Sequence, residues 1–263
     1  MGFSDLPELT IGSYRLRSRL FVGTGKYDTL EVMQEALVAS GTDLVTVALR
    51  RVNLNNPQEP TILDAIPQGC TILPNTAGCH TAEEAVQVAH LARASGIGDL
   101  IKLEVIGDQQ LLWPDPIETL EATRRLVQDG FTVMVYTSPD PILADYLQKA
   151  GAHAIMPLGS PIGSGQGVLD VSQIQWIKAR VSVPVVVDAG IGSPADAAMA
   201  MEAGADAVLV NTAIAQSRDP VVMARAMQAA VVAGYWGRMA GRMPKRPQAV
   251  PSSPVSGVPH VSA

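Results

Sequence analysis

Eight short apolar runs, separated by longer polar or helix-patterned segments, constrain the fold of this chain more than any other feature. The runs are Leu20–Gly25, Leu44–Arg50, Thr71–Ala77, Leu100–Ile106, Thr132–Ser138, Ala154–Gly159, Pro184–Gly190 and Ala207–Ala213. Amphipathic stretches lie between them, such as Thr81–Ser95, Pro116–Gln128, Ile142–Ala150, Pro194–Ala203 and Val221–Ala233. Strands that alternate with helices predict βαβ units and a parallel sheet.

The count of eight and the length of 263 residues favour a closed barrel, because such barrels are built from eight βα units in about 250 residues. A doubly wound open sheet is the alternative, but no run is followed by a GxGxxG loop with a distal acid. We therefore predict an α/β protein with a single (β/α)8 TIM barrel. Ser193 before Pro194 predicts a helix start. Five glycines are predicted to end helices in the left-handed conformation: Gly41, Gly96, Gly130, Gly151 and Gly204.

The composition changes after Met243. Residues 1–243 are predicted to form the catalytic barrel, whereas residues 244–263 are rich in Pro and Ser and lack periodicity. That composition predicts a disordered C-terminal tail, with a lid over the site as the alternative.

The overall composition excludes several classes of protein. The chain is 47% hydrophobic with a net charge of -6, which is typical of a globular protein and gives no electrostatic reason to bind nucleic acid or an anionic membrane. No apolar run is long enough to span a membrane, and the first 20 residues do not resemble a secretory leader, so we expect a cytoplasmic protein. Cys70 and the Cys79–His80 pair do not make a metal-ligand set, and we expect no metal.

The fourth run, Leu100–Ile106, carries the most informative polar residues. Side chains alternate across a strand, so Lys102 and Glu104 share one face and the apolar residues of the run share the other. If the apolar face packs on the helices, Lys102 and Glu104 point into the barrel near its mouth, where active sites of this fold lie. Burial would lower the pKa of Lys102 and favour a Schiff-base amine, whereas Glu104 would raise it. A structural ion pair is the alternative.

The seventh and eighth runs end in groups suited to a substrate. Asp188 follows a fully apolar stretch, and at the mouth of a barrel strand an acid is more often chemical than structural. Ala189–Gly192 is predicted to expose backbone N–H groups beside a helix start, which suits a phosphate. Asn211 and Thr212 end the eighth run, and the loops after strands seven and eight form the common phosphate site of this fold.

Two further loops leave their roles open. The glycine-rich segment Gly159–Gly167 could close over a ligand or serve as a flexible connector. Arg50 and Arg51, after the second run, either bind phosphate or carboxylate or are simply solvated.

Taken in order, these stretches resemble bacterial thiazole synthase, a family of thiamin biosynthesis. The resemblance runs from about residue 8 to 243 and touches nearly every predicted strand, while the tail lies outside it and Gly234–Gly237 is less typical. The matching pieces are Gly23–Tyr27, Leu73–Gly78, Lys102–Val105, Met156–Leu158, Pro161–Gly165, Asp188–Gly192 and Val210–Ile214.

The resemblance implies a reaction that spacing alone does not. The family condenses 1-deoxy-D-xylulose 5-phosphate, a glycine-derived dehydroglycine, and sulfur from the C-terminal thiocarboxylate of a small carrier protein. Carried over, Lys102 forms an imine with the sugar ketone, and Glu104 and Asp188 are the acid/base candidates. The residues that match the sugar-phosphate contacts are Gly163, Ala189, Gly190, Asn211 and Thr212.

The resemblance implies no metal and no organic cofactor. The expected partners are the sulfur carrier, the enzyme that supplies dehydroglycine, and further copies of this chain in a homo-oligomer. Two rival functions remain open. A Schiff-base aldolase would use the same lysine and phosphate site but no sulfur partner, and a sugar-phosphate-binding scaffold would form no imine.

Overall fold

The computed structural model describes residues 5–48 and 61–253 of the chain. Each predicted run contains one strand of the barrel within the described residues, although the end of the run Leu44–Arg50 lies outside them. The strands and the helices that follow them are β3 (Leu20–Gly23), α1 (Leu30–Ser40), β4 (Leu44–Ala48), β5 (Thr71–Asn75), α2 (Ala82–Ala94), β6 (Leu100–Leu103), α3 (Pro116–Gln128), β9 (Thr132–Thr137), α4 (Pro141–Lys149), β10 (Ala154–Pro157), α5 (Val171–Arg180), β11 (Val186–Asp188), α6 (Pro194–Ala203), β12 (Ala207–Val210), α7 (Thr212–Ala215) and α8 (Pro220–Ala240).

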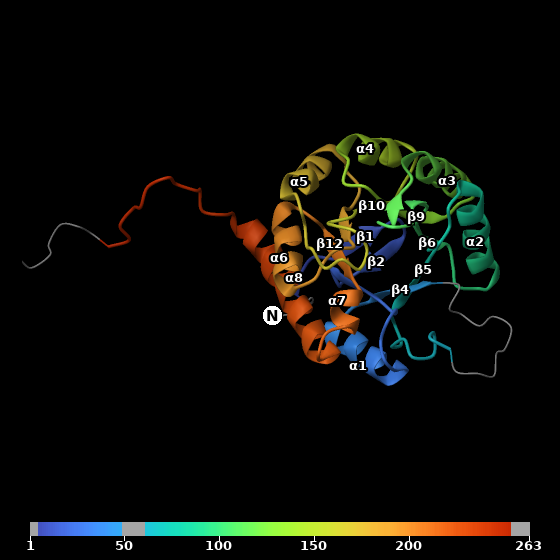
Figure 1. The fold of residues 1–263 in the computed structure, drawn as a ribbon, viewed down its shortest axis with the longest axis horizontal. Helices are drawn as coiled ribbons and strands as arrows, with labels where there is room; N and C mark the ends of the chain where they lie inside the picture. Colours follow the sequence, from blue (N-terminus) through green and yellow to red (C-terminus); the bar gives the residue numbers. More distant parts are fainter. Residues whose placement is uncertain (1–4, 49–60, 254–263) are drawn as a thin grey trace, which may run out of the picture.

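The eight strands form one parallel sheet in the order β10-β9-β6-β5-β4-β3-β12-β11. Its outer strands also meet, because Ile155 pairs with Val185 and Leu158 pairs with Asp188 in parallel bridges. The sheet therefore closes on itself, and the helices surround it (Figure 1). The predicted (β/α)8 barrel is confirmed. Between β4 and β5, the described residues 61–70 form turns rather than a helix.

Several helices begin with a capping side chain followed by proline. Ser193 accepts a hydrogen bond from the backbone N–H of Asp196 at the start of α6, as predicted. The same arrangement starts α3, α4 and α8, where Asp115, Asp140 and Asp219 each precede a proline and accept backbone N–H groups. All five glycines that were predicted to end helices have positive φ angles, which confirms that prediction.

Helix α8 is longer than predicted, since it continues to Ala240 instead of ending at Ala233. The predicted amphipathic stretch stopped before Gly234, which lies directly against α6. A Cβ at Gly234 would lie 2.5 Å from the carbonyl oxygen of Ala198. The glycine therefore permits close packing of two helices, and the helix continues through it.

Two hairpins were not predicted. The strands β1 (Leu9–Ile11) and β2 (Tyr14–Leu16) pair antiparallel. Their side chains Leu9, Ile11 and Leu16 pack with residues at the starts of barrel strands, such as Leu44 and Leu100, so the hairpin covers the amino-terminal end of the barrel.

The second hairpin consists of β7 (Ile106–Asp108) and β8 (Trp113–Pro114). The predicted fourth strand, Leu100–Ile106, was wrong at its end, because β6 stops at Leu103 and Ile106 begins this hairpin.

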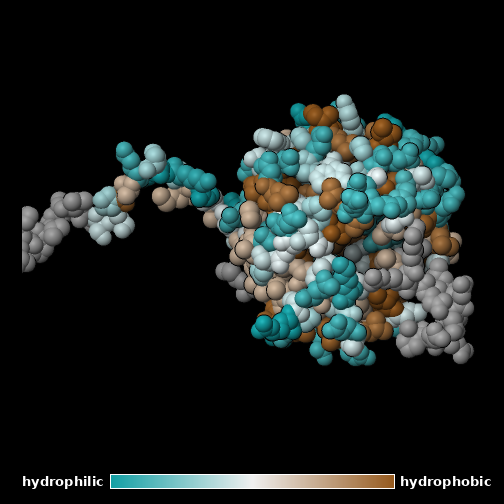
Figure 2. Space-filling model, in the orientation of Figure 1, coloured by the Kyte–Doolittle hydropathy of each residue, from teal (hydrophilic) through white to brown (hydrophobic). Residues whose placement is uncertain are grey.

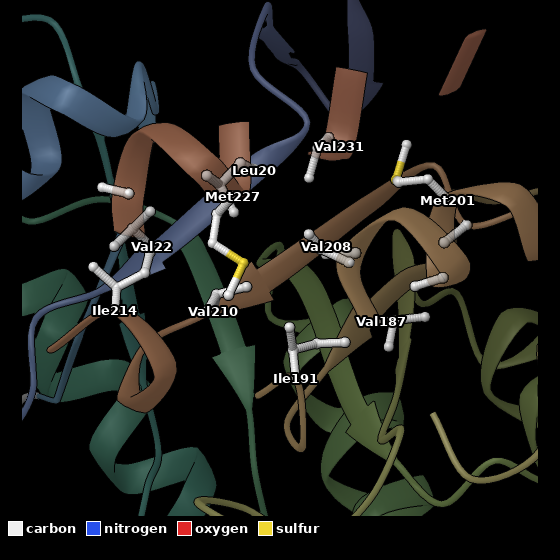
Figure 3. Close-up of a cluster of buried hydrophobic side chains, with 14 of the residues drawn as sticks. Leu20, Val22, Val187, Ile191, Met201, Val208, Val210, Ile214, Met227 and Val231 are labelled. Atoms are coloured by element: carbon white, nitrogen blue, oxygen red, sulfur yellow. The ribbon is translucent and has the colours of Figure 1, made fainter. Parts of the chain in front are cut away.

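The largest apolar cluster lies between the barrel and the helices α6 and α8. Figure 3 shows Val208 and Val210 of β12 close to Met227 of α8, with Met201 of α6 beside them. Small and branched aliphatic side chains fill this layer because a parallel sheet under helices is buried on both faces.

Residues 244–253 contain no helix or strand and are exposed. Figures 1 and 2 show this segment leading away from the barrel beyond α8. The assignment of residues 1–243 as the domain and 244–263 as its tail remains a prediction. Among the helices that the structure describes, none is both long and apolar enough to cross a membrane.

Candidate active site

A cavity of about 440 Å³ opens at the carboxyl-terminal ends of the barrel strands. This is the end that carries the active site in barrel enzymes. It is lined by residues that end β3, β4, β5, β6, β11 and β12 and by the loop after β10. All eight predicted site residues line it: Lys102, Glu104, Asp188, Gly163, Ala189, Gly190, Asn211 and Thr212.

Three charged side chains meet at the bottom of this cavity. The ammonium of Lys102 lies 3.1 Å from Oε1 of Glu104 and also forms an ion pair with Asp188. Each of the three side chains is at most 7% exposed. The barrel therefore buries two carboxylates around one ammonium, and this cluster retains one negative charge when all three groups are ionised.

Burial lowers the pKa of Lys102, but the carboxylates of Asp188 and Glu104 raise it by more, so the net shift is upward. This answers the question that the sequence left open about the lysine. Burial also raises the pKa of Asp188, and repulsion from Glu104 adds to that rise, while Lys102 opposes it. The lysine is therefore protonated at rest, and Asp188, the carboxylate paired with it, is more basic than an ordinary aspartate.

The strand register explains why Lys102 and Glu104 face the cavity. Ile101, Leu103 and Val105 are buried in the apolar layer that contains residues of α2 and α3. The backbone is also held from β5, because the Thr76 hydroxyl donates to the carbonyl of Glu104 at 2.7 Å and accepts the N–H of Glu104 at 2.8 Å. Thr76 was not predicted as a site residue, although it lies within one of the stretches that carry the family resemblance.

Tyr136 is a second buried neighbour of the cluster that the sequence analysis missed. Lys102 pairs with Met134 across β6 and β9, so Tyr136, two residues further along β9, lies beside the cluster. Nζ of Lys102 lies 5.6 Å from the centre of its ring, and its hydroxyl donates to the carbonyl of Leu112 at 3.4 Å. Burial raises the pKa of Tyr136, as do the two carboxylates. The sequence feature that could have identified Tyr136 as a site residue is a polar aromatic side chain near the end of a predicted barrel strand.

The glycine-rich loop after β10 is fixed to the loop after β11. Gly159 donates its N–H to the carbonyl of Ala189 at 3.2 Å, and Gly167 donates to the carbonyl of Gly190 at 2.8 Å. The prediction of exposed N–H groups was wrong for Gly192, whose N–H donates to Asp196 at 3.1 Å. Among the described residues, no acceptor binds the N–H of Gly163 or Gly190. These two groups therefore remain able to bind a ligand.

Asn211 brings a further polar group to the same side of the cavity. Its Oδ1 is buried and has no hydrogen-bond partner within residues 5–48 and 61–253. The side chain reaches this position because residue 23 is glycine: a Cβ there would lie 2.7 Å from Cβ of Asn211. A buried polar atom without a partner is costly, so a substrate hydroxyl or N–H would stabilise it.

Arg50 and Arg51 lie outside the described residues. In the part of the chain that is described, no three His, Cys, Asp or Glu side chains form a group that could hold a metal ion.

Comparison with known proteins supports a specific family. The family model "Thiazole biosynthesis protein ThiG" matches residues 10–254. The thiazole synthase of Aliarcobacter butzleri is 56% identical, over 95% of this chain and 97% of that protein. The thiazole synthase of Anoxybacillus flavithermus is 54% identical, over 95% and 98%.

Among solved structures, the BexX/CysO complex of Amycolatopsis orientalis contains a chain that is 34% identical and has a TM-score of 0.82, with 91% of this chain and 98% of that chain covered. A structure described as native KDPGal, 22% identical with a TM-score of 0.57, supports the fold alone. The family match over nearly the whole chain and the identity to relatives lead to one conclusion: this chain belongs to the thiazole synthase family, the enzymes that make the thiazole of thiamin.

Proposed function

We propose that this chain forms the thiazole phosphate of thiamin from 1-deoxy-D-xylulose 5-phosphate, dehydroglycine and a carrier-bound thiocarboxylate, through an imine on Lys102. The observation that carries this proposal is the buried lysine between two carboxylates at the bottom of a cavity large enough for a small sugar phosphate. A structural ion pair alone would not require a cavity around its ammonium.

The cluster can supply each proton that imine formation needs. Lys102 first transfers a proton from Nζ to Asp188, the carboxylate paired with it; the raised pKa of Lys102 opposes this step, and the raised pKa of Asp188 lessens its cost. The neutral amine then attacks the ketone carbon: a C–N bond forms, the C=O π bond breaks, and Asp188 returns its proton to the oxygen, which becomes a hydroxyl. The positively charged nitrogen of this adduct then gives one proton to Asp188 or Glu104, and that carboxyl passes it to the hydroxyl. The C–O bond breaks, water leaves, and the protonated C=N bond of the imine remains.

The phosphate binds at the loops after β10, β11 and β12. Gly163 and Gly190 offer backbone N–H groups that no described residue uses. Glycine at position 163 leaves the backbone of this exposed loop uncovered, so that the oxygens of a phosphate can approach it closely. Asn211 and Thr212 line the same region and suit the hydroxyls of the sugar.

Sulfur reaches this site from a small carrier protein. The Amycolatopsis orientalis relative was crystallised as a complex with CysO, and we propose that this chain likewise binds a small carrier whose C-terminus enters the mouth of the barrel. A separate enzyme supplies dehydroglycine, and the chain assembles as a homo-oligomer.

Borohydride trapping tests the imine. Incubation with 1-deoxy-D-xylulose 5-phosphate and borohydride is expected to add one sugar to the chain, on the peptide that contains Lys102, as read by intact and peptide mass spectrometry. Lys102→Ala leaves two carboxylates buried without a cation, which costs about 3–5 kcal/mol of stability. Lys102→Arg is therefore the cleaner variant, because it keeps the charge but offers no reactive amine. It should fold and form neither adduct nor product.

The outcomes of this experiment distinguish the proposed mechanism from the rival functions. An adduct on another lysine, or full turnover in Lys102→Arg, would refute the mechanism. A scaffold that only binds sugar phosphates would form no adduct. An aldolase would form the adduct and cleave the sugar without the carrier, whereas the synthase requires dehydroglycine and carrier thiocarboxylate for product.

A further inference from the structure

The charge inside the cavity is unfavourable for a phosphorylated substrate. Within the described residues, Lys102 is the one cationic side chain in the lining, and two carboxylates surround it. A phosphate monoester brings a charge of about -1.5 to -2 at neutral pH. The backbone N–H groups of Gly163 and Gly190 are dipoles and do not cancel that charge. A further cation close to the phosphate loops would complement it.

Lys26 lies where such a cation is needed. It follows Thr24 and Gly25, two residues that line the cavity after β3. Its side chain reaches across to the loop after β10, where Nζ lies 3.6 Å from the position that a Cβ of Gly163 would occupy. Gly163 lines the cavity and has no side chain, so the ammonium lies beside the backbone of the loop after β10.

The backbone of Lys26 adopts a conformation that is unusual for its residue type. Its φ angle is +68°, in the left-handed region that favours glycine. Only Leu112 and Ala189 share this feature among the non-glycine residues that the structure describes, and Ala189 lines the cavity. A non-glycine residue keeps such a conformation only where the surrounding structure enforces it, and such residues occur often at ligand sites.

The ammonium of Lys26 is also available for a ligand. Lys149 pairs with Asp145 and Lys178 pairs with Asp206. Across residues 5–48 and 61–253, no carboxylate lies within ion-pair distance of Lys26. An exposed lysine without a partner is common, but the ammonium of this one lies close to Gly163, at the edge of a cavity whose charged cluster carries a net negative charge.

We propose that Lys26 binds the phosphate of the substrate and selects phosphorylated over unphosphorylated ketoses. This inference rests on the proposed function, because it assigns a further contact at the same site. Lys26 touches the phosphate and takes no part in the imine, so its loss should change the concentration at which substrate saturates the site and leave the reaction at Lys102 intact.

The test compares two ketoses on matched variants. Lys26→Gln keeps a polar side chain, one bond shorter, and the same backbone requirement, but removes the charge. Lys149→Gln removes the charge of an exposed lysine on α4 and serves as the control. Borohydride-trapped adduct is measured by intact mass against the concentration of 1-deoxy-D-xylulose 5-phosphate and of unphosphorylated 1-deoxy-D-xylulose.

We expect Lys26→Gln to raise the half-saturating concentration of the phosphorylated ketose by roughly tenfold or more, as for the loss of a charged hydrogen bond. The unphosphorylated ketose should be unaffected, Lys26→Arg should retain most of the affinity, and Lys149→Gln should match the wild type. Unchanged saturation by the phosphorylated ketose in Lys26→Gln overturns the inference, and so does an equal loss for both ketoses.

Calorimetry with inorganic phosphate separates this inference from the proposed function. If the wild type forms no adduct with either ketose, the imine proposal fails, and phosphate binding alone then decides the role of Lys26. If the wild type binds phosphate and Lys26→Gln binds it at least several-fold more weakly, the inference about Lys26 is supported. Equal binding by both proteins, or no binding by the wild type, overturns it.

Discussion

At Gly190, both the backbone and the neighbouring loop exclude a side chain. Its φ angle is +81°, and a Cβ there would lie 2.5 Å from the backbone nitrogen of Ser160 and 2.8 Å from its carbonyl oxygen. Gly130 has nearly the same angle, +80°, but nothing lies within 4 Å of its Cβ position. The two glycines therefore separate the cost of the angle from the cost of the contact.

Alanine at each position should measure these two costs. Gly130→Ala is expected to lower the unfolding free energy by about 1 kcal/mol, which is the penalty of the left-handed backbone alone. Gly190→Ala should cost about 3 kcal/mol or more and should also weaken binding of the sugar phosphate, because the loop after β10 must move. Urea unfolding and adduct saturation provide the two measurements. Similar stabilities for the two variants would mean that the loop accommodates a methyl group freely.

At the scale of the element, α8 depends on close contact with α6. A Cβ at Gly234 would lie 2.5 Å from the carbonyl oxygen of Ala198 and 2.8 Å from Cβ of Met201. At Gly237, one turn further, it would meet only the carboxylate end of Glu202, at 2.9 Å. The backbone of Ala198 cannot move away from a new Cβ unless the two helices separate. The flexible side chain of Glu202 can rotate away while the helices stay in contact.

These two glycines should therefore respond to alanine in opposite directions. Gly234→Ala is expected to lower the unfolding free energy by about 1–3 kcal/mol through overpacking. Gly237→Ala should raise it by up to about 1 kcal/mol, because alanine favours the helix. Thermal and urea unfolding decide between the outcomes. A stabilised Gly234→Ala would show that α6 and α8 have room to separate.

For the whole molecule, the remaining prediction concerns the segment after the barrel. Residues 244–253 are exposed and form no helix or strand, and α8 ends before them at Ala240. Deletion of residues 244–263 should therefore leave the melting temperature within about 2 °C and preserve imine formation. Scanning calorimetry and borohydride trapping of the truncated chain test this. A large fall in melting temperature would show that the tail packs on the barrel, and lost trapping with intact folding would favour the alternative of a lid.

The sequence by itself determined the eight strands, their parallel pairing and the face on which Lys102 and Glu104 lie. These properties depend on local periodicity, which follows from backbone geometry and can be read without knowing the distant neighbours. The helix caps at Ser193 and at the five glycines were predictable for the same reason. The ordered motifs also identified the family, which the comparisons confirm.

Only the tertiary structure decided which distant groups meet. Closure of the barrel places Asp188 against Lys102, and the resulting balance of burial and charge sets the direction of the lysine pKa. Tertiary packing also lets α8 continue through Gly234 against α6, and it places the ammonium of Lys26 close to Gly163. These outcomes depend on distances between residues far apart in the chain. Local patterns do not contain those distances, because packing of the closed barrel sets them.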